Sequence, residues 1–157
     1  MLGRGGDGHG PPVVVGDPDA QPVRRRPHGP EATAAATRSG IASVAFSEQS
    51  LADLRAQGRV VFVNMTADWC VSCKANEKTV FARAGFRNAL DAADAVYMVG
   101  DYTDVDPAIT AYLQQHKAVG VPLYVVYPRG GGEGVILPVI LTPGIAERAL
   151  AQAASGR

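Results

Sequence analysis

The chain lacks long hydrophobic runs near its start, and its charges give no net excess of either sign. The longest apolar run in the first forty residues is Val13–Val15, whereas a signal peptide needs roughly 7 to 15 apolar residues and a membrane-spanning helix about 20. The 15 basic and 15 acidic residues cancel, so no net field attracts nucleic acid or an anionic membrane. These absences predict a chain with no leader and no membrane span, which recognises its partners by local shape and chemistry.

Cysteine is also scarce, since only two are present among 157 residues. No second pair exists to crosslink the fold, so the core must be stable without such links, and cysteine usage does not decide the compartment. With 46% hydrophobic and 19% charged residues, the length fits one globular domain.

Residues 1–40 differ in composition from the rest of the chain. They are rich in Gly, Pro, Arg and Ala, and they contain no aromatic residue and no periodic apolar pattern. Such a segment buries too little surface to offset the entropy of ordering it. We therefore expect 1–40 to be disordered or outside the domain, with a domain over 41–157, and we interpret Arg24–Arg26 as solvated linker.

From Phe46 onward the patterns predict alternating strands and helices. Helices are expected over 47–58, 71–90 with a break at Gly85, 106–117 and 142–154, and strands over 59–65, 95–103, 121–127 and 135–141. Two crossover connections imply parallel pairing, while the glycine-rich turn 128–134 implies a terminal antiparallel hairpin. Pro138 places the last strand near an edge or a bulge. The fold class is α/β, with a central mixed sheet flanked by helices.

The two cysteines, Cys70 and Cys73, are two residues apart, directly after Trp69, where a buried strand ends and a helix begins. At a helix start, unpaired backbone N–H groups and the positive end of the helix dipole favour a thiolate and lower the thiol pKa. This placement predicts that Cys70 is the nucleophile of thiol–disulfide exchange and Cys73 the resolving thiol.

Other functions of the cysteine pair fit less well. A structural zinc site needs about four ligands, and outside the pair the folded region offers only His116. Covalent haem attachment needs a histidine after the second cysteine, where this chain has Lys74. Two buried cysteines acting as small apolar residues stay an alternative, although a strand-to-helix junction is a poor place to bury a side chain. We expect no metal and no other cofactor.

The three segments VFVNMTADWCVSCKANE, GDYTDVDPAITAYL and VGVPLYVVY resemble the thioredoxin family. They are most similar to the C-terminal thioredoxin-like domain of bacterial transmembrane thiol:disulfide interchange proteins of the DsbD and ScsB type. The resemblance implies a thioredoxin-like fold and a cis Val121–Pro122 peptide bond beside the cysteines. In that arrangement Val121 and Pro122 pair with an extended substrate segment, and Trp69 forms part of the docking surface, with simple core packing as the alternative for Trp69.

One position departs from the family pattern. Many relatives carry a buried carboxylate six residues before the first cysteine, where this chain has Asn64. An amide cannot take up the proton of the resolving thiol. Glu77, one turn after Cys73, matches an acidic position of the family and is our first candidate for that role, and Asp68 is the second. For either, an exposed acid on a helix surface is the alternative.

The resemblance implies a protein-disulfide reductase or electron carrier, and therefore an enzyme. Its expected partners are protein thiols and disulfides, among them a membrane-embedded electron-donor domain and periplasmic acceptor proteins, with no nucleic acid. We expect a monomer, in the periplasm by resemblance, or in the cytoplasm if the chain is complete. The alternative function is a thioredoxin-fold module that binds peptides without turnover.

Overall fold

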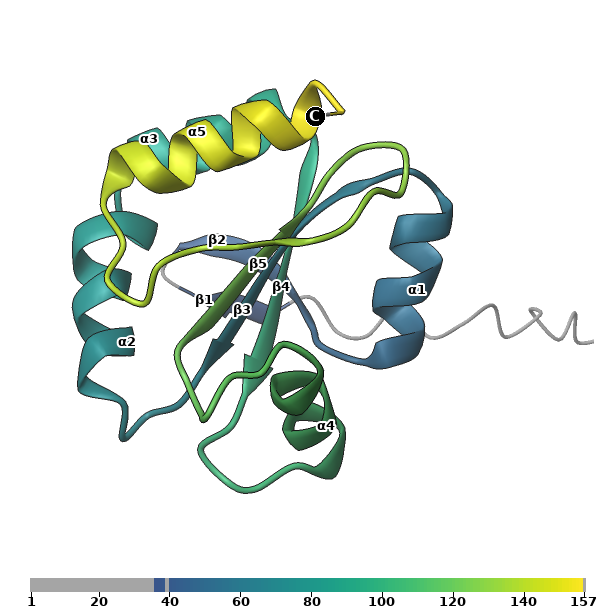
Figure 1. Ribbon diagram of the computed structural model, residues 1–157. Coiled ribbons are helices and arrows are strands. Elements are labelled where there is room, and N and C mark those ends of the chain that lie inside the picture. The colour runs from purple at the N-terminus through teal and green to yellow at the C-terminus, as the bar shows by residue number, and fades with distance from the viewer. Residues whose placement is uncertain (1–35, 39, 157) are drawn as a thin grey trace, which may run out of the picture. The chain divides into compact units, whose positions relative to one another are not determined.

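A computed structural model describes residues 36–38 and 40–156 (Figure 1). In chain order the elements are β1 (Ala36–Arg38), β2 (Ile41–Ala45), α1 (Glu48–Ala56), β3 (Val60–Thr66), α2 (Val71–Asn76), the π-helical η1 (Glu77–Phe81), α3 (Ala84–Ala92), β4 (Ala95–Asp101), α4 (Pro107–Gln115), β5 (Leu123–Tyr127), β6 (Val135–Ile136) and α5 (Pro143–Ala154). Helices cover the sheet, so the predicted α/β class with a mixed sheet and flanking helices is confirmed.

The sheet has the order β1-β2-β4-β3-β5-β6. β4 runs parallel to both β2 and β3, whereas β5 is antiparallel to β3, and β6 is antiparallel to β5. The expected terminal hairpin is therefore present, but the parallel pairing expected from the second crossover is wrong. Leu123 at the start of β5 pairs with Met65 near the end of β3, and α4 lies at that end of the sheet (Figure 1). The chain therefore enters β5 at the end where β4 finishes, and β5 must run back.

The sheet begins earlier than the sequence predicted. β2 was not expected, and β1 falls inside 1–40, the segment expected to be disordered or outside the domain. Ile41 and Ser43 of β2 are buried, and the residue between them is exposed. This short strand pairs with β4. The prediction for residues 1–35 lies outside the described residues.

Two further boundaries differ from expectation. The helical region after the cysteines is interrupted at Arg83, whose backbone is extended, and Gly85 lies in the first turn of α3 instead of at a break. β6 contains only two residues, because Pro138 has no backbone N–H with which to continue the ladder.

The central strand β3 is buried along its whole length, and its side chains alternate between two cores. Phe62 packs against the aromatic rings of Phe81 and Phe86 on the side of α3 and α5. Val63 and Met65 belong to the opposite core, which includes residues of α1 and α4. This double burial fixes the end of β3, from which the cysteine segment departs.

No helix in 36–38 and 40–156 has the length and apolar character needed to cross a lipid bilayer.

Candidate active site

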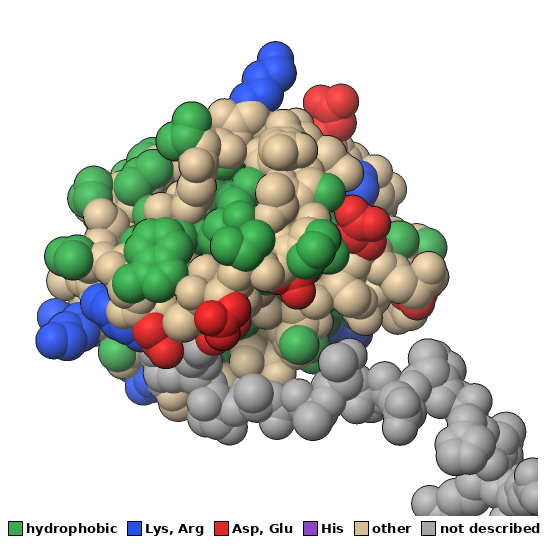
Figure 2. Space-filling view, turned by 90° about the horizontal axis from the view of Figure 1, so that it is seen from below, with side chains coloured by type: hydrophobic (Ala, Val, Ile, Leu, Met, Phe, Trp, Pro, Cys, Tyr) green, Lys and Arg blue, Asp and Glu red, His purple; other side chains and the backbone are tan. Residues whose placement is uncertain are grey.

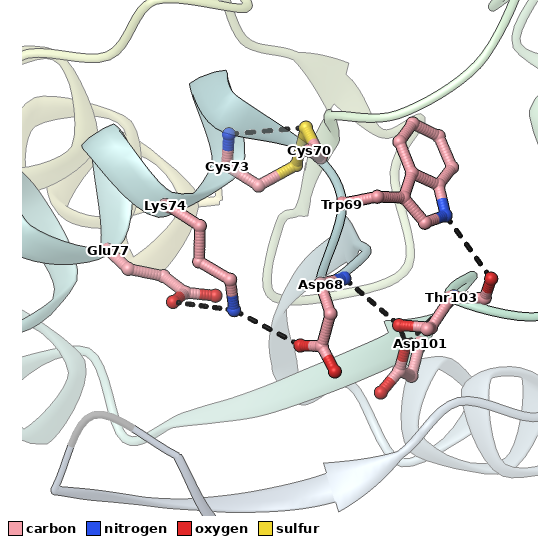
Figure 3. A network of polar contacts seen from close by, with 8 residues as sticks. All are labelled: Asp68, Trp69, Cys70, Cys73, Lys74, Glu77, Asp101 and Thr103. Carbon is pink, nitrogen blue, oxygen red and sulfur yellow. Dashed lines mark hydrogen bonds and ion pairs between the residues drawn. A yellow bond between two sulfur atoms is a disulfide. The ribbon is translucent and has the colours of Figure 1, made fainter.

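Cys70 lies at the junction between β3 and α2, and it caps the N-terminus of that helix. Its Sγ accepts a hydrogen bond from the backbone N–H of Cys73 at 3.2 Å, and a disulfide joins the two residues (Figure 3). Cys70 is 6% exposed and Cys73 is 1% exposed. Both residues are therefore buried, and Cys70 is the slightly more exposed of the two.

Trp69 is 60% exposed, which rules out the core-packing alternative for its side chain. Its indole Nε1 donates to the backbone oxygen of Thr103 at 3.2 Å, and the backbone N of Asp68 donates to Thr103 Oγ1 at 2.9 Å. Thr103 is in turn held by Asp101, to which its backbone N and its hydroxyl both donate. The loop after β4 thus presents the indole beside the cysteines (Figure 3).

The Val121–Pro122 peptide bond is cis, as the resemblance implied. Val121 packs against the small cluster formed by Cys70, Cys73 and Ala67, so this segment lies directly beside the disulfide. A groove of about 660 Å³ begins here, lined by Trp69, residues 116–123 and three residues near β6, Ile136, Leu137 and Val139. Figure 2 shows hydrophobic side chains gathered on one face of the molecule, and Trp69 and Val119 are among the exposed apolar residues.

Asn64 occupies the position where the resemblance implies a carboxylate, and it is 1% exposed in β3. Its Nδ2 donates to the Tyr97 hydroxyl at 2.7 Å. Its Oδ1 is buried and accepts no hydrogen bond from any described residue. The side chain buried at this position is therefore an uncharged amide, which does not ionise near neutral pH and so cannot take up the proton of a thiol.

Glu77 begins η1, one turn after Cys73, and its side chain is mostly buried. Its Oε2 lies 3.5 Å from Lys74 Nζ, which also contacts Asp68 Oδ1 at 3.1 Å (Figure 3). The hydrogen bond to Asp68, with the charge of Glu77, outweighs desolvation and raises the pKa of Lys74. Within the described part of the chain Glu77 Oε1 is buried without a hydrogen-bond partner. Of the two candidate acids, Glu77 is therefore the less exposed and Asp68 the one more open to solvent.

Asn76 is a residue of this region that the sequence did not reveal. It is the last residue of α2 and is buried. Its Nδ2 donates to the Tyr124 hydroxyl and to the Val139 carbonyl, each at 2.8 Å, and its Oδ1 accepts from Leu141 N at 3.2 Å. These partners are 48, 63 and 65 residues further along the chain, so no local pattern could have identified them.

Among residues 36–38 and 40–156, no three His, Cys, Asp or Glu side chains gather in a way that would hold a metal ion.

Comparison with known proteins gives both a family and relatives. The sequence pattern of a family described as thioredoxin-like matches residues 42–128, more than half of the chain. The thiol:disulfide interchange protein DsbD of Colwellia psychrerythraea is 33% identical over 94 residues, which are 59% of this chain and 15% of that protein. The DsbD of Pseudoalteromonas atlantica is 36% identical over 86 residues, 55% of this chain and 14% of that protein. The matched segment is therefore about a seventh of the length of these curated relatives.

Solved structures show the same fold. The oxidised C-terminal domain of Neisseria meningitidis DsbD superposes with a TM-score of 0.55 at 21% identity, covering 74% of this chain and all of that domain. A thioredoxin from Thermus thermophilus gives a TM-score of 0.54 at 22% identity and covers 71% of this chain and 87% of that chain. A cysteine pair at disulfide distance in a DsbD-like domain supports a thiol–disulfide oxidoreductase. The chain belongs to the thioredoxin-like family, as the match over residues 42–128 shows.

Proposed function

We propose that the chain is a protein-disulfide reductase or electron carrier that works through the Cys70–Cys73 pair. The observation that carries the proposal is the position of the disulfide at the start of α2, with Val121 of the cis-proline segment packed against the cysteines and the exposed Trp69 directly before Cys70. A partner disulfide would approach Cys70, the slightly more exposed of the two cysteines, while Cys73 stays covered until the mixed disulfide has formed.

The cycle begins with both cysteines reduced. The Cys70 thiolate attacks one sulfur of a partner disulfide, so that a Cys70–partner bond forms, the partner S–S bond breaks, and the released partner thiolate takes a proton. The Cys73 thiolate then attacks Cys70 Sγ, and the second partner thiolate leaves. Two electrons have passed to the partner, and the chain is left with the disulfide seen in the structure. A dithiol donor protein returns the two electrons by the same exchange in reverse.

Glu77 is our proposed acceptor for the proton that Cys73 must lose before it attacks. It lies one helical turn from Cys73, is mostly buried, and has one carboxylate oxygen without a hydrogen bond from the described residues. Asn64 cannot serve because an amide does not ionise, and Asp68 is the more exposed partner of Lys74. The Lys74 ammonium lies 3.5 Å from the other oxygen of Glu77.

Partner docking is assigned to Trp69, Val121 and Pro122. The exposed indole offers an apolar surface at one side of the cysteines, and Val121 packs against them from another. The Val121–Pro122 bond is cis, and we propose that an extended partner segment pairs with the backbone of Val121 as an added strand.

The partners follow from the relatives. Because the matched proteins are named thiol:disulfide interchange proteins, we propose that this chain exchanges electrons with protein thiols and disulfides. We further propose a membrane-embedded domain as the electron donor, proteins of the periplasm as acceptors, and the periplasm as the location.

Two substitutions test the proposal. The reduced protein should reduce insulin disulfides, and Cys70→Ser should abolish this activity, because the proposed nucleophile is lost and Cys73 is the more deeply buried of the two cysteines. Cys73→Ser should stop the cycle at the mixed disulfide and trap the partner covalently. Full insulin reduction by Cys70→Ser would contradict the mechanism. Peptide binding that survives in the doubly substituted Cys→Ser protein, with no reductase activity in the wild type, would instead favour a non-catalytic binding module in this groove.

A further inference from the structure

Two partly buried side chains pack against the cysteines from outside their own segment. Ala67, Cys70 and Cys73 form a small buried cluster, and among the described residues the partly buried side chains packed against it are Val121 and Tyr102. Val121 belongs to the docking surface proposed above. Tyr102 does not line the groove, but it packs both against the cysteine cluster and against the core that includes residues of α1 and α4.

The backbone around Tyr102 is fixed on both sides of the residue. Tyr102 directly follows β4, and its backbone N donates to the oxygen of Thr66, the last residue of β3, at 2.7 Å. The next residue, Thr103, accepts hydrogen bonds from Asp68 N and from the indole of Trp69. The ring of Tyr102 therefore extends from a backbone position that is tied to β3 and to the segment before the first cysteine.

The far end of the ring is anchored to α4. The Tyr102 hydroxyl lies 2.8 Å from Thr110 Oγ1. The Thr110 hydroxyl donates its own hydrogen to the Asp106 carbonyl oxygen at 2.8 Å, so Tyr102 is the donor in the bond between the two hydroxyls. Asp106 also caps this helix, because its carboxylate accepts from two backbone N–H groups of the first turn. The ring is thus held at both ends beside the cysteine cluster.

An apolar ring beside the cysteines affects their oxidised and reduced forms differently. The disulfide is neutral and needs no water, whereas the thiolate of the reduced pair is stabilised by hydration. Apolar surface packed against the pair withholds water from that charge and disfavours it. A ring that is held in place therefore favours the disulfide, while a ring that moves away lets water reach the reduced cysteines.

We propose that Tyr102 sets the redox balance of the site: its ring, anchored by Thr110, shields the Cys70–Cys73 pair from water and favours the disulfide form. The dithiol then gives up its electrons to a partner disulfide more readily. The proposal rests on the reductase function and adds a determinant of the direction in which electrons flow.

Exchange with glutathione measures this balance directly. Two glutathione thiols pass two electrons and two protons to the protein disulfide, which becomes the dithiol, and glutathione disulfide is released. The equilibrium constant of this reaction falls as the protein disulfide becomes more stable relative to the dithiol. A contact that stabilises both forms equally leaves the constant unchanged, because only the difference between the two effects appears in it.

Tyr102→Phe and Thr110→Val remove the same hydrogen bond from opposite ends. Each should raise the equilibrium constant for reduction by glutathione about threefold, because a ring without its anchor shields the cysteines less well. The double variant should raise the constant no further than either single variant, since only one bond is lost. Tyr102→Ala removes the ring as well and should raise the constant about tenfold.

Thr79 offers a matched control for Thr110. Each of the two threonine hydroxyls donates to the carbonyl oxygen four residues earlier, that of Ala75 at 2.9 Å for Thr79 and that of Asp106 for Thr110. Only Thr110 also accepts a hydrogen bond from Tyr102, and Thr79 is exposed in η1. Thr79→Val should therefore keep the glutathione equilibrium constant within about twofold of the wild type.

The outcomes separate this proposal from the reductase function. If Tyr102→Phe and Thr110→Val keep or lower the wild-type constant, or shift it no more than Thr79→Val does, the proposal is refuted. If the double variant shows the product of the two single shifts, the bond between the hydroxyls is not their cause and the anchor is refuted. If Tyr102→Ala does not fold, the two single variants that keep the size of the side chain still decide. A wild-type protein that does not reduce insulin would refute the reductase function, whereas the glutathione equilibrium tests Tyr102 in either case.

Discussion

Replacing Asn64 by Asp tests how strongly the site near the cysteines disfavours charge. The substitution keeps the size of the side chain and introduces the acid that the family resemblance implies at this position. Asn64 is 1% exposed and sits in the fully buried strand β3. A carboxylate placed there loses nearly all of its hydration, and desolvation raises the pKa of a fully buried acid by up to about 3 to 5 units.

The expected magnitude follows from this burial. A hydrogen bond from the Tyr97 hydroxyl, which lies 2.7 Å from Asn64 Nδ2, would stabilise the carboxylate and reduce the shift to about two or three units. At about 1.36 kcal/mol per unit, the charged form destabilises the folded protein by about 2.7 to 4 kcal/mol. Because the pKa is higher in the folded than in the unfolded protein, this loss is absent at low pH. It grows as the pH rises above the unfolded value of about 3.9 and is nearly complete at about pH 8.

The assay is urea unfolding of the oxidised protein between pH 4 and 8, because the disulfide keeps both cysteines from titrating. The wild type in the same buffers corrects for all other groups. With an m-value of about 2 kcal/mol per M, the urea midpoint of Asn64→Asp should fall by about 1.5 to 2 M relative to the wild type at high pH. If the difference between the two proteins changes by less than about 0.5 kcal/mol across this range, the position is hydrated and our account of the site is wrong.

Two other substitutions test packing and pH dependence. Gly100→Ala should lower the free energy of unfolding by about 1 to 3 kcal/mol, because the added Cβ would overlap the fully buried Met65 Sδ and crowd Ile109. Urea titrations measure this change, and an unchanged urea midpoint would contradict the packing described here. Burial lowers the pKa of His116, whose ring lies 3.4 Å from the Tyr127 hydroxyl. Because His116 binds a proton more readily in the unfolded than in the folded protein, the free energy of unfolding should fall as the pH drops through about 6.5. His116→Gln should weaken that dependence between pH 7 and 5, and identical pH profiles of the two proteins would count against it.

The sequence predicted the parts of the site that depend on local order. A buried strand, two cysteines and a helix start follow one another within a few residues. The helices expected from residues 47, 106 and 142 do begin there, where Ser47, Asp106 and Thr142 act as N-caps. Local chemistry determines these features, because a cap or a strand end is formed by neighbours in the chain.

The features that the sequence did not predict depend on distant partners. β2 is a five-residue strand whose place is secured by pairing with β4, more than fifty residues later. The direction of β5 is set by where α4 lies against the sheet, which a strand–helix–strand pattern does not specify. In the sequence Asn76 looks like an ordinary helix residue, because its three hydrogen-bond partners are far away along the chain.

The short β6 also has a consequence for association between molecules. An exposed sheet edge with unpaired backbone groups can add a strand from another chain and so promote aggregation. Here the ladder on β5 stops after Ile136 and Pro138 follows, so an incoming strand would find only a two-residue stretch with which to align. Redox proteins of this kind must admit foreign polypeptides briefly and then release them. The short edge strand β6 therefore disfavours lasting addition of a strand from another chain, while the apolar groove nearby stays accessible.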